Sequence, residues 1–211
     1  MKSISKYTQA FVHRSYVNEH PGQQSNERLE FLGDSVLSLI ISTRLYNLFP
    51  NLPEGQLTAR RSYLVQTTTL AQRAKQLGLD KQLLLSAGEE LSGGRTNTGL
   101  LANTFEAVLG AMYLEDGLSA CEEYLLEIFP DSELLNLAPS QVKDSKSLLQ
   151  EKAQSQNLGT PVYKILSSEG PDHARKFTVA VSVNGKQLAT GQGTSKQRAE
   201  AAAATAAVAV I

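Results

Sequence analysis

Three acidic residues stand in a stretch that is otherwise typical of a buried helix. Asn26 to Ser38 reads N-E-R-L-E-F-L-G-D-S-V-L-S, with Glu27, Glu30 and Asp34 at positions i, i+3 and i+7. On a helix these positions share one face, and neighbours on that face have Cβ atoms about 5–6 Å apart. Carboxylates beside an apolar helix are costly unless they are neutralised, and Mg²⁺ takes oxygen ligands of this kind. The pattern therefore indicates a metal site.

The alternative interpretation is a solvated acidic stripe at the start of a helix, where the helix dipole favours negative charge. Glu27 fits both interpretations. Asp34 fits the stripe less well, because it lies a full turn further along and follows Gly33, a residue that allows close approach to the backbone.

A second stretch, Gly99 to Gly117, predicts a strongly apolar helix that carries Asn103 and Glu106 on one face. A carboxylate in so apolar a helix calls for a cation, and the first acidic helix can supply the remaining ligands. Asn103 offers a carbonyl oxygen without charge, so we expect weaker divalent binding than four carboxylates would give.

Composition suggests two different parts. The chain has 211 residues, enough for two small domains or one large one. Residues 1–142 carry 11 Lys+Arg and 16 Asp+Glu, a net of −5, whereas residues 143–211 carry 9 and 5, a net of +4. An acidic first part followed by a basic second part favours a metal-using body joined to an anion-binding module, although compositional scatter would give the same numbers.

The elements that position these residues follow from periodicity and from turn residues. One helix is expected over residues 57–77, ending at Gly78, and a Pro-containing linker over 130–142. His13, on an expected helix over residues 7–17, is interpreted as a hydrogen-bonded packing residue in preference to a general base. The single Cys121 allows no intrachain disulfide, and the N-terminus shows no secretory signal, so we expect a cytoplasmic protein that does not enter a membrane.

Residues 143–211 predict the order αβββα. Helices are expected over 145–156 and 196–210, and strands over 162–167, 177–183 and 186–191. Asn184-Gly185 between the last two strands is a strong hairpin signal, and Thr194-Ser195 precedes the final helix as a capping pair.

The stretch N-E-R-L-E-F-L-G-D-S-V-L resembles the signature of the ribonuclease III family of double-strand-specific endoribonucleases. This resemblance implies an all-α endonuclease domain, with Mg²⁺, or Mn²⁺ as a substitute, held by Glu30, Asp34, Asn103 and Glu106, of which Asp34 and Glu106 are the catalytic pair. Many members have aspartate where this chain has Asn103. The resemblance also implies a homodimer in which Phe31 contributes to the subunit contact, although a core position accounts for that side chain equally well.

The stretches D-S-K-S-L-L-Q-E, G-P-D-H-A-R-K-F and G-T-S-K-Q-R-A-E-A-A-A-A resemble the double-stranded RNA-binding domain, an α+β fold. Lys196 and Arg198 at the start of the last helix would meet phosphates. The residues expected to reach the minor groove and its 2′-hydroxyls are Gln150, Glu151, Pro171, Asp172 and His173.

Together these features predict a catalytic domain over 1–129, a linker over 130–142 and an RNA-binding domain over 143–211. The expected function is metal-dependent cleavage of double-stranded RNA in RNA processing and decay, and the resemblance implies products with 5′-phosphates and short 3′ overhangs. Two alternatives remain open. One is a non-cleaving double-stranded RNA binder whose metal site is weakened by Asn103, and the other is a metal-binding helical enzyme of another class.

Overall fold

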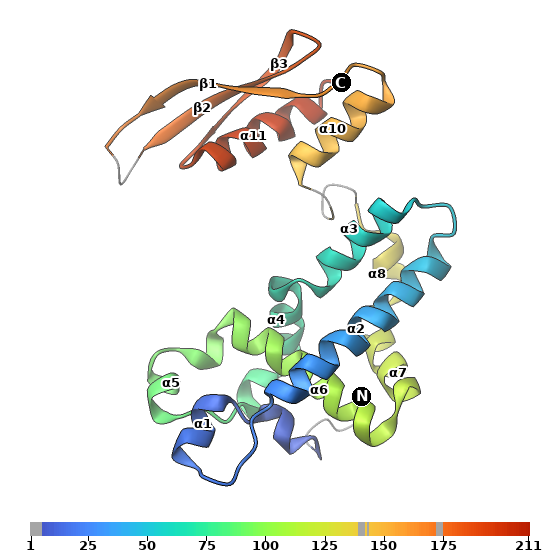
Figure 1. The fold of residues 1–211 in the computed structure, drawn as a ribbon, viewed down its shortest axis with the longest axis vertical. Helices are drawn as coiled ribbons and strands as arrows, with labels where there is room; N and C mark the ends of the chain where they lie inside the picture. The colour runs from blue at the N-terminus through green and yellow to red at the C-terminus, as the bar shows by residue number, and fades with distance from the viewer. Residues whose placement is uncertain (1–5, 139–141, 143, 172–174) are drawn as a thin grey trace. The chain divides into compact units, whose positions relative to one another are not determined.

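The computed structural model describes residues 6–138, 142, 144–171 and 175–211, and the chain divides into two units, Met1–Leu137 and Ala138–Ile211. The first unit is helical (Figure 1). Its helices are α1 (Arg14–Glu19), α2 (Glu27–Leu48), α3 (Glu54–Val65), α4 (Thr67–Gln76), α5 (Ala87–Leu91), α6 (Thr98–Asp116), α7 (Leu118–Ile128) and α8 (Asp131–Leu135). Short 3-10 helices lie at η2 (Thr8–Phe11), η3 (Leu79–Gln82) and η4 (Gly94–Thr96).

The two long helices α2 and α6 cross with their backbones in contact. A Cβ atom built on Gly33 of α2 would lie 1.8 Å from the Glu106 carbonyl oxygen of α6. A Cβ atom on Gly110 of α6 would lie 2.1 Å from the Leu29 carbonyl oxygen of α2. Only glycine fits at these two points, because any side chain would push the helices apart. The crossing therefore sets the register between the two helices.

Helix α6 is the centre of the first unit. Most of its side chains are buried, including Phe105, Val108, Leu109 and Met112, which are fully inaccessible. The helix begins at the N-cap Asn97, whose side-chain oxygen accepts from the backbone N–H groups of the next turn, and it ends at Gly117. Helices α2, α4 and α7 pack around it.

The expected helix over 57–77 is in fact two helices, so this prediction was wrong in one detail. Gln66 has an extended backbone (φ −67°, ψ 150°), and it separates α3 from α4. The hydroxyl of Thr69 donates to the Tyr63 carbonyl across this break at 2.8 Å. The predicted stop at Gly78 is confirmed, since Gly78 adopts the left-handed conformation (φ 71°).

Part of the expected linker is also helical. Helix α8 lies within it, and its Leu134 is fully buried in the first unit. Two arginines hold this helix: Arg44 of α2 pairs with Asp131 at 2.5 Å, and Arg73 of α4 pairs with Glu133. The first unit therefore continues beyond Pro130.

The second unit has the predicted αβββα order. Its elements are α10 (Ser145–Ser155), β1 (Val162–Glu169), β2 (Lys176–Val183), β3 (Lys186–Gly193) and α11 (Lys196–Val208). The strands form one antiparallel sheet in the order β1-β2-β3. Asn184 and Gly185 both have positive φ in the hairpin turn, which confirms the turn predicted there.

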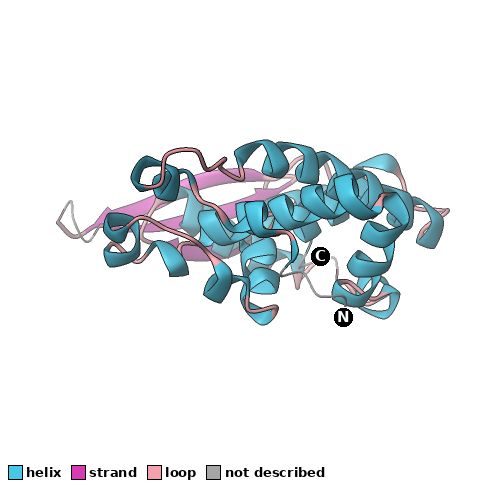
Figure 2. Ribbon diagram, turned by 90° about the horizontal axis from the view of Figure 1, so that it is seen from below, coloured by secondary structure: helices cyan, strands magenta, loops and turns pink. Residues whose placement is uncertain are grey.

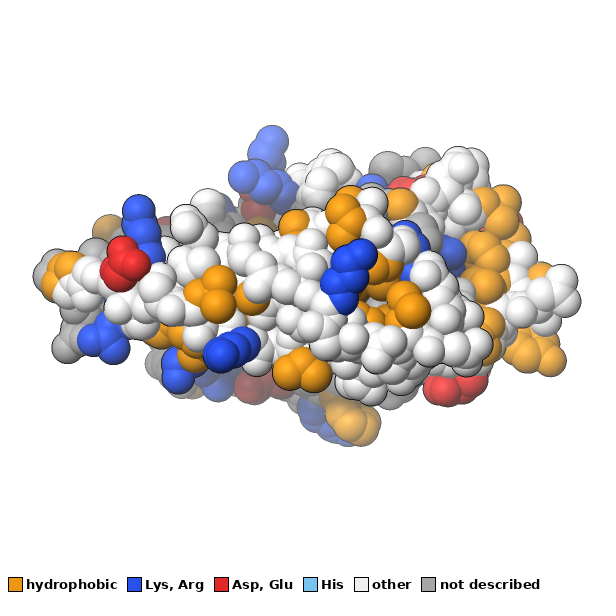
Figure 3. Space-filling model, turned by 90° about the horizontal axis from the view of Figure 1, so that it is seen from above, with side chains coloured by type: hydrophobic (Ala, Val, Ile, Leu, Met, Phe, Trp, Pro, Cys, Tyr) orange, Lys and Arg blue, Asp and Glu red, His pale blue; other side chains and the backbone are white. Residues whose placement is uncertain are grey.

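Both helices of the second unit cover one face of this sheet (Figure 1), whose strands are magenta in Figure 2. Helix α11 lies directly on β3, because a Cβ on Gly191 would meet the Ala203 nitrogen at 2.1 Å. The buried core between the layers combines Leu149 and Val181 with the small side chains of Ala203, Ala204 and Ala207, and partly buried Tyr163 and Leu188 pack against it. On the opposite face of the sheet, hydrophobic side chains are scattered among Lys and Arg (Figure 3).

Among the described residues no helix is both long and apolar enough to cross a membrane.

The α2–α6 crossing yields a stability prediction. Gly33→Ala should lower the free energy of unfolding by roughly 1–3 kcal/mol, the usual cost of forcing a methyl group into a filled contact. Gly55→Ala is the matched control, because it makes the same chemical change on a helix where the new Cβ meets nothing within 4 Å. Chemical denaturation followed by helical circular dichroism compares the two variants. Equal stability would show that the helices do not depend on this contact.

Candidate metal centre

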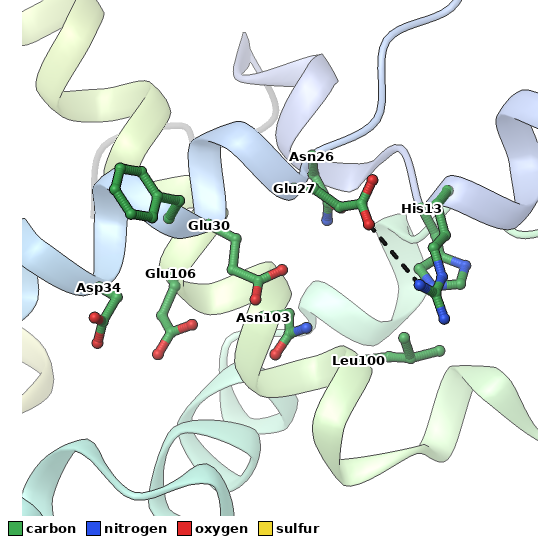
Figure 4. A pocket seen from close by; sticks show the side chains of 10 residues that line it. His13, Asn26, Glu27, Glu30, Asp34, Leu100, Asn103 and Glu106 are labelled. Carbon is green, nitrogen blue, oxygen red and sulfur yellow. Dashed lines mark ion pairs between the residues drawn. The ribbon is translucent and has the colours of Figure 1, made fainter.

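The α2–α6 crossing brings the predicted metal-binding residues into one pocket. Glu30 and Asp34 come from α2, and Asn103 and Glu106 come from α6. All four line a cavity of about 540 Å³. In Figure 4 their side chains converge from the two helices, with Glu30 next to Asn103 and Asp34 next to Glu106. The packing of Gly33 on the Glu106 backbone explains this arrangement. It places Glu30 and Asp34, which flank Gly33 on α2, opposite Asn103 and Glu106 on α6.

The pocket holds more negative charge than it can neutralise. Burial raises the pKa of Glu106 to about 7, and the nearby charges of Asp34 and Glu30 contribute to this rise. Burial also raises the pKa of Glu30, and Glu27 adds to the effect, while a side-chain hydrogen bond from Asn103 opposes it. A divalent cation would relieve both the desolvation and the repulsion.

The donor set fits a hard cation. The carboxylates of Glu27, Glu30, Asp34 and Glu106 line the pocket together with the amides of Asn26 and Asn103, and oxygen ligands of this kind suit Mg²⁺. Within the part of the chain that the structure describes, no three His, Cys, Asp or Glu side chains are already drawn together at ligand spacing. The carboxylates instead stand around the open space of the pocket.

Asn103 contacts a carboxylate in this arrangement. Its side chain hydrogen-bonds Glu30, and this bond favours the charged form of that carboxylate by lowering its pKa. The amide therefore orients a neighbouring oxygen donor without adding a negative charge of its own.

His13 and Arg14 also line the pocket, and sequence reasoning missed both. His13 is not inside a helix. It is the N-cap of α1, and its Nδ1 accepts from the Ser15 backbone N–H at 3.3 Å. No sequence signal places it there; in the structure Asn26, which is 4% exposed, joins the start of α2 to this segment by donating its side-chain N–H to the Ala10 carbonyl.

Phe31 lies on the outer side of α2 with 79% of its surface exposed. This observation excludes the core position that the sequence left open. A subunit contact remains the prediction for this side chain.

In the second unit, four of the RNA-binding candidates lie exposed on helices. Gln150 and Glu151 are on α10, and Lys196 and Arg198 are in the first turn of α11. The α11 turn is held by Ser195, whose hydroxyl accepts from the Arg198 backbone N–H at 3.2 Å. Pro171 is also exposed. Asp172 and His173 lie outside the described residues.

Comparison with known families and sequences identifies close similarity to one group of proteins. Residues 4–132 match the family model described as "Ribonuclease-III-like", and residues 145–211 match the "Double-stranded RNA binding motif". The chain is 45% identical over 202 residues to "Ribonuclease 3" of Streptococcus thermophilus, which covers 94% of this chain and 87% of that protein. It is 46% identical over 199 residues to "Ribonuclease 3" of a Geobacillus species, covering 93% and 80%.

The first unit is also similar to a solved structure. The nuclease domain of ribonuclease III from Campylobacter jejuni superposes with a TM-score of 0.56 and 33% identity, covering 62% of this chain and 89% of that one. That nuclease domain shows structural flexibility in a region involved in dimer formation.

The raised pKa of Glu106 predicts pH-dependent cation binding. Below about pH 7 the metal-free pocket holds a proton on Glu106 that a cation must displace, so the affinity should fall by up to about tenfold per pH unit. The same proton adds stability to the metal-free protein that is fully present below pH 4.5 and is lost as the pH rises through about 7.

Calorimetry of Mn²⁺ binding at pH 6 and pH 8, in buffers of different ionisation enthalpy, counts the released protons. Proton release at pH 6 that disappears in Glu106→Gln is the expected result. Equal affinity and equal proton release at both pH values would contradict it.

Proposed function

The chain belongs to the ribonuclease III family, and we infer from this membership that it is an endoribonuclease that cuts double-stranded RNA by hydrolysis of phosphodiester bonds. The cleavage is divalent-metal dependent. The observation that carries this proposal is the pocket where α2 and α6 bring Glu30, Asp34, Asn103 and Glu106 together. The match of residues 145–211 to a double-stranded RNA binding motif supports the choice of substrate.

Each residue of the pocket has a proposed role. Glu30, Asp34 and Glu106 would hold Mg²⁺, or Mn²⁺ in its place, and Asp34 and Glu106 are the catalytic pair. The hydrogen bond from Asn103 to Glu30 favours the charged form of that carboxylate against the effect of burial, and the Asn103 amide oxygen would be a fourth ligand. A bound cation would supply Lewis-acid stabilisation of the phosphate and would activate water. The buried apolar sides of α2 and α6 hold the ligands in place around the pocket.

The second unit supplies affinity for the duplex. Lys196 and Arg198 offer two cations at the start of α11 for phosphates. Gln150 and Glu151, with Pro171 and His173, are the proposed contacts to the minor groove and its 2′-hydroxyls. Domains of this kind span about 16 bp and read the shape of the duplex more than its sequence.

The proposed division of the chain is a catalytic domain that includes α8, a short linker after it and an RNA-binding domain over 143–211. The proposed assembly is a homodimer in the cytoplasm, with Phe31 in the subunit contact, where each pocket cuts one strand and leaves a 5′-phosphate and a short 3′ overhang. The exposure of Phe31 supports the contact. Processing of ribosomal and messenger RNA precursors is the proposed cellular role.

The first test of this function is Glu106→Gln. The variant should lose cleavage of a long RNA duplex in Mg²⁺ and keep nearly unchanged duplex binding, because Glu106 would hold the cation whereas affinity comes mainly from phosphate contacts. Glu115→Gln is the matched control on the exposed end of the same helix. Parallel loss of binding and cleavage in Glu106→Gln would assign Glu106 a structural role.

A substitution at Asn103 distinguishes an enzyme from a non-cleaving RNA binder. The neutral Asn103 side chain stands where a fourth carboxylate would add one more negative charge to the metal site. The wild type should be active and should need more Mg²⁺ than Asn103→Asp, since an added carboxylate strengthens divalent binding. Titration of cleavage rate against Mg²⁺ compares the two proteins. Overlapping curves would show that position 103 does not influence the metal, and activity in Asn103→Asp alone would favour the non-cleaving binder.

A further inference from the structure

One end of the metal pocket carries the hydrogen-bond donors His13 and Arg14, although most of the other polar residues that line it are acidic. His13 and Arg14 line the same cavity as Glu30, Asp34 and Glu106. In Figure 4 His13 lies at the end away from Asp34, beyond Glu27. The RNA backbone is a polyanion, so a pocket of carboxylates repels it unless cations or hydrogen-bond donors stand beside the carboxylates. These two residues are donors in the right place for that purpose.

The Arg14 guanidinium is only loosely engaged within the protein. Its ion pair with Glu27 spans 3.9 Å, and 74% of the Arg14 side chain and 56% of the Glu27 side chain are exposed. An exposed pair of this kind contributes little to stability. The guanidinium can therefore turn from Glu27 to a phosphate at small cost.

The hydrogen bonds of His13 favour the tautomer that carries its proton at Nε2. Nδ1 accepts from the Ser15 backbone N–H at 3.3 Å and lies 2.8 Å from the Ser15 hydroxyl. A neutral imidazole that accepts at Nδ1 carries its proton at Nε2. Burial lowers the pKa of His13, which favours this neutral form. The ring thus presents an N–H donor on the side opposite Ser15.

The segment that carries both residues is tied to the body of the first unit. The His13 backbone N–H donates to the Leu84 carbonyl at 3.1 Å, and the Ser86 N–H donates to the Ser15 hydroxyl at 3.1 Å. The Asn26 N–H donates to the Val12 carbonyl at 2.8 Å, which joins the segment to the start of α2. These bonds hold His13 and Arg14 in a defined position relative to the carboxylates of α2.

We propose that His13 and Arg14 form a backbone anchor for the RNA strand beside the scissile phosphate. In this anchor, the Arg14 guanidinium donates to a non-bridging phosphate oxygen. The His13 Nε2–H donates to a backbone oxygen of an adjacent nucleotide, either on a phosphate or on a 2′-hydroxyl. The inference rests on the proposed function and extends it to residues outside the metal ligands.

The test of Arg14 uses a short RNA duplex with one mapped cleavage site, under single-turnover conditions with saturating Mg²⁺. Arg14→Ala should slow cleavage about tenfold, the effect expected for one lost charge-assisted hydrogen bond, and Arg14→Lys should recover part of the rate. Arg28→Ala is the control, because Arg28 is an exposed arginine on α2 outside the pocket lining.

A methylphosphonate placed at one phosphate at a time then locates the contact. At one position next to the cleavage site, the neutral methylphosphonate should lower the cleavage rate of the wild type. The same substitution should not lower the rate of Arg14→Ala any further. If Arg14→Ala cuts as fast as Arg28→Ala, or if Glu27→Gln restores the rate of Arg14→Ala, the anchor is wrong and Arg14 only neutralises Glu27.

The test of His13 uses two substitutions that separate its roles. His13→Asn keeps a side-chain acceptor for the Ser15 N–H and lacks the Nε2–H, whereas His13→Gln places an amide N–H near the lost position. Cleavage should slow about tenfold in His13→Asn and recover in His13→Gln. A 2′-deoxy or a methylphosphonate substitution whose effect vanishes in His13→Asn identifies the acceptor. Wild-type rates in both variants would remove His13 from the anchor.

Failure of the proposed function gives a different result. A wild type that cuts no duplex in Mg²⁺ or Mn²⁺ would refute the proposed nuclease activity. The anchor would then be tested by measurements of duplex binding alone. In that case the slope of log Kd against log salt should fall by about one phosphate contact in Arg14→Ala and stay unchanged in Arg28→Ala. Equal slopes would refute the anchor.

Discussion

The backbone contact between α2 and α6 is the constraint on which the first unit depends. Gly33 and Gly110 each face a carbonyl oxygen of the other helix at a distance that leaves no room for a side chain. This contact fixes the rotation and the register of both helices, so their polar faces open into the same pocket. The buried sides of α6 meanwhile supply the apolar packing that holds the charged residues close together. Burial of Glu106 beside the charges of Asp34 and Glu30 disfavours its charged form, and this is why the pKa of Glu106 is raised.

Much of the fold was predictable because it depends on local signals. The helix–strand–helix order of the second unit follows from period-two alternation and from Asn184-Gly185, and the structure confirms it. The face shared by Glu30 and Asp34 follows from helical spacing. The meeting of this face with Asn103 and Glu106 was inferred from the need of a buried carboxylate for a cation and from the family resemblance, because sequence spacing alone does not place two helices against each other. The roles of these side chains remain predictions.

The features that sequence reasoning missed depend on distant contacts. No proline or glycine marks the break at Gln66, and the bond from Thr69 to the Tyr63 carbonyl is visible only in the folded chain. Helix α8 is too short to show periodicity, and it is held by Arg44 and Arg73, which lie far away in sequence. The place of His13 in the pocket likewise depends on backbone bonds to Leu84 and on the link from Asn26 to Val12.

The alanine-rich face of α11 also has a thermodynamic consequence. Alanine lets the helix approach β3 until the backbones touch, but each buried methyl group removes little apolar surface from water. A small unit with such a thin core is expected to have a modest intrinsic stability. Any ligand that binds only its folded form then shifts the folding equilibrium by mass action. The amount of double-stranded RNA available to this unit would therefore help to determine how much of it is folded.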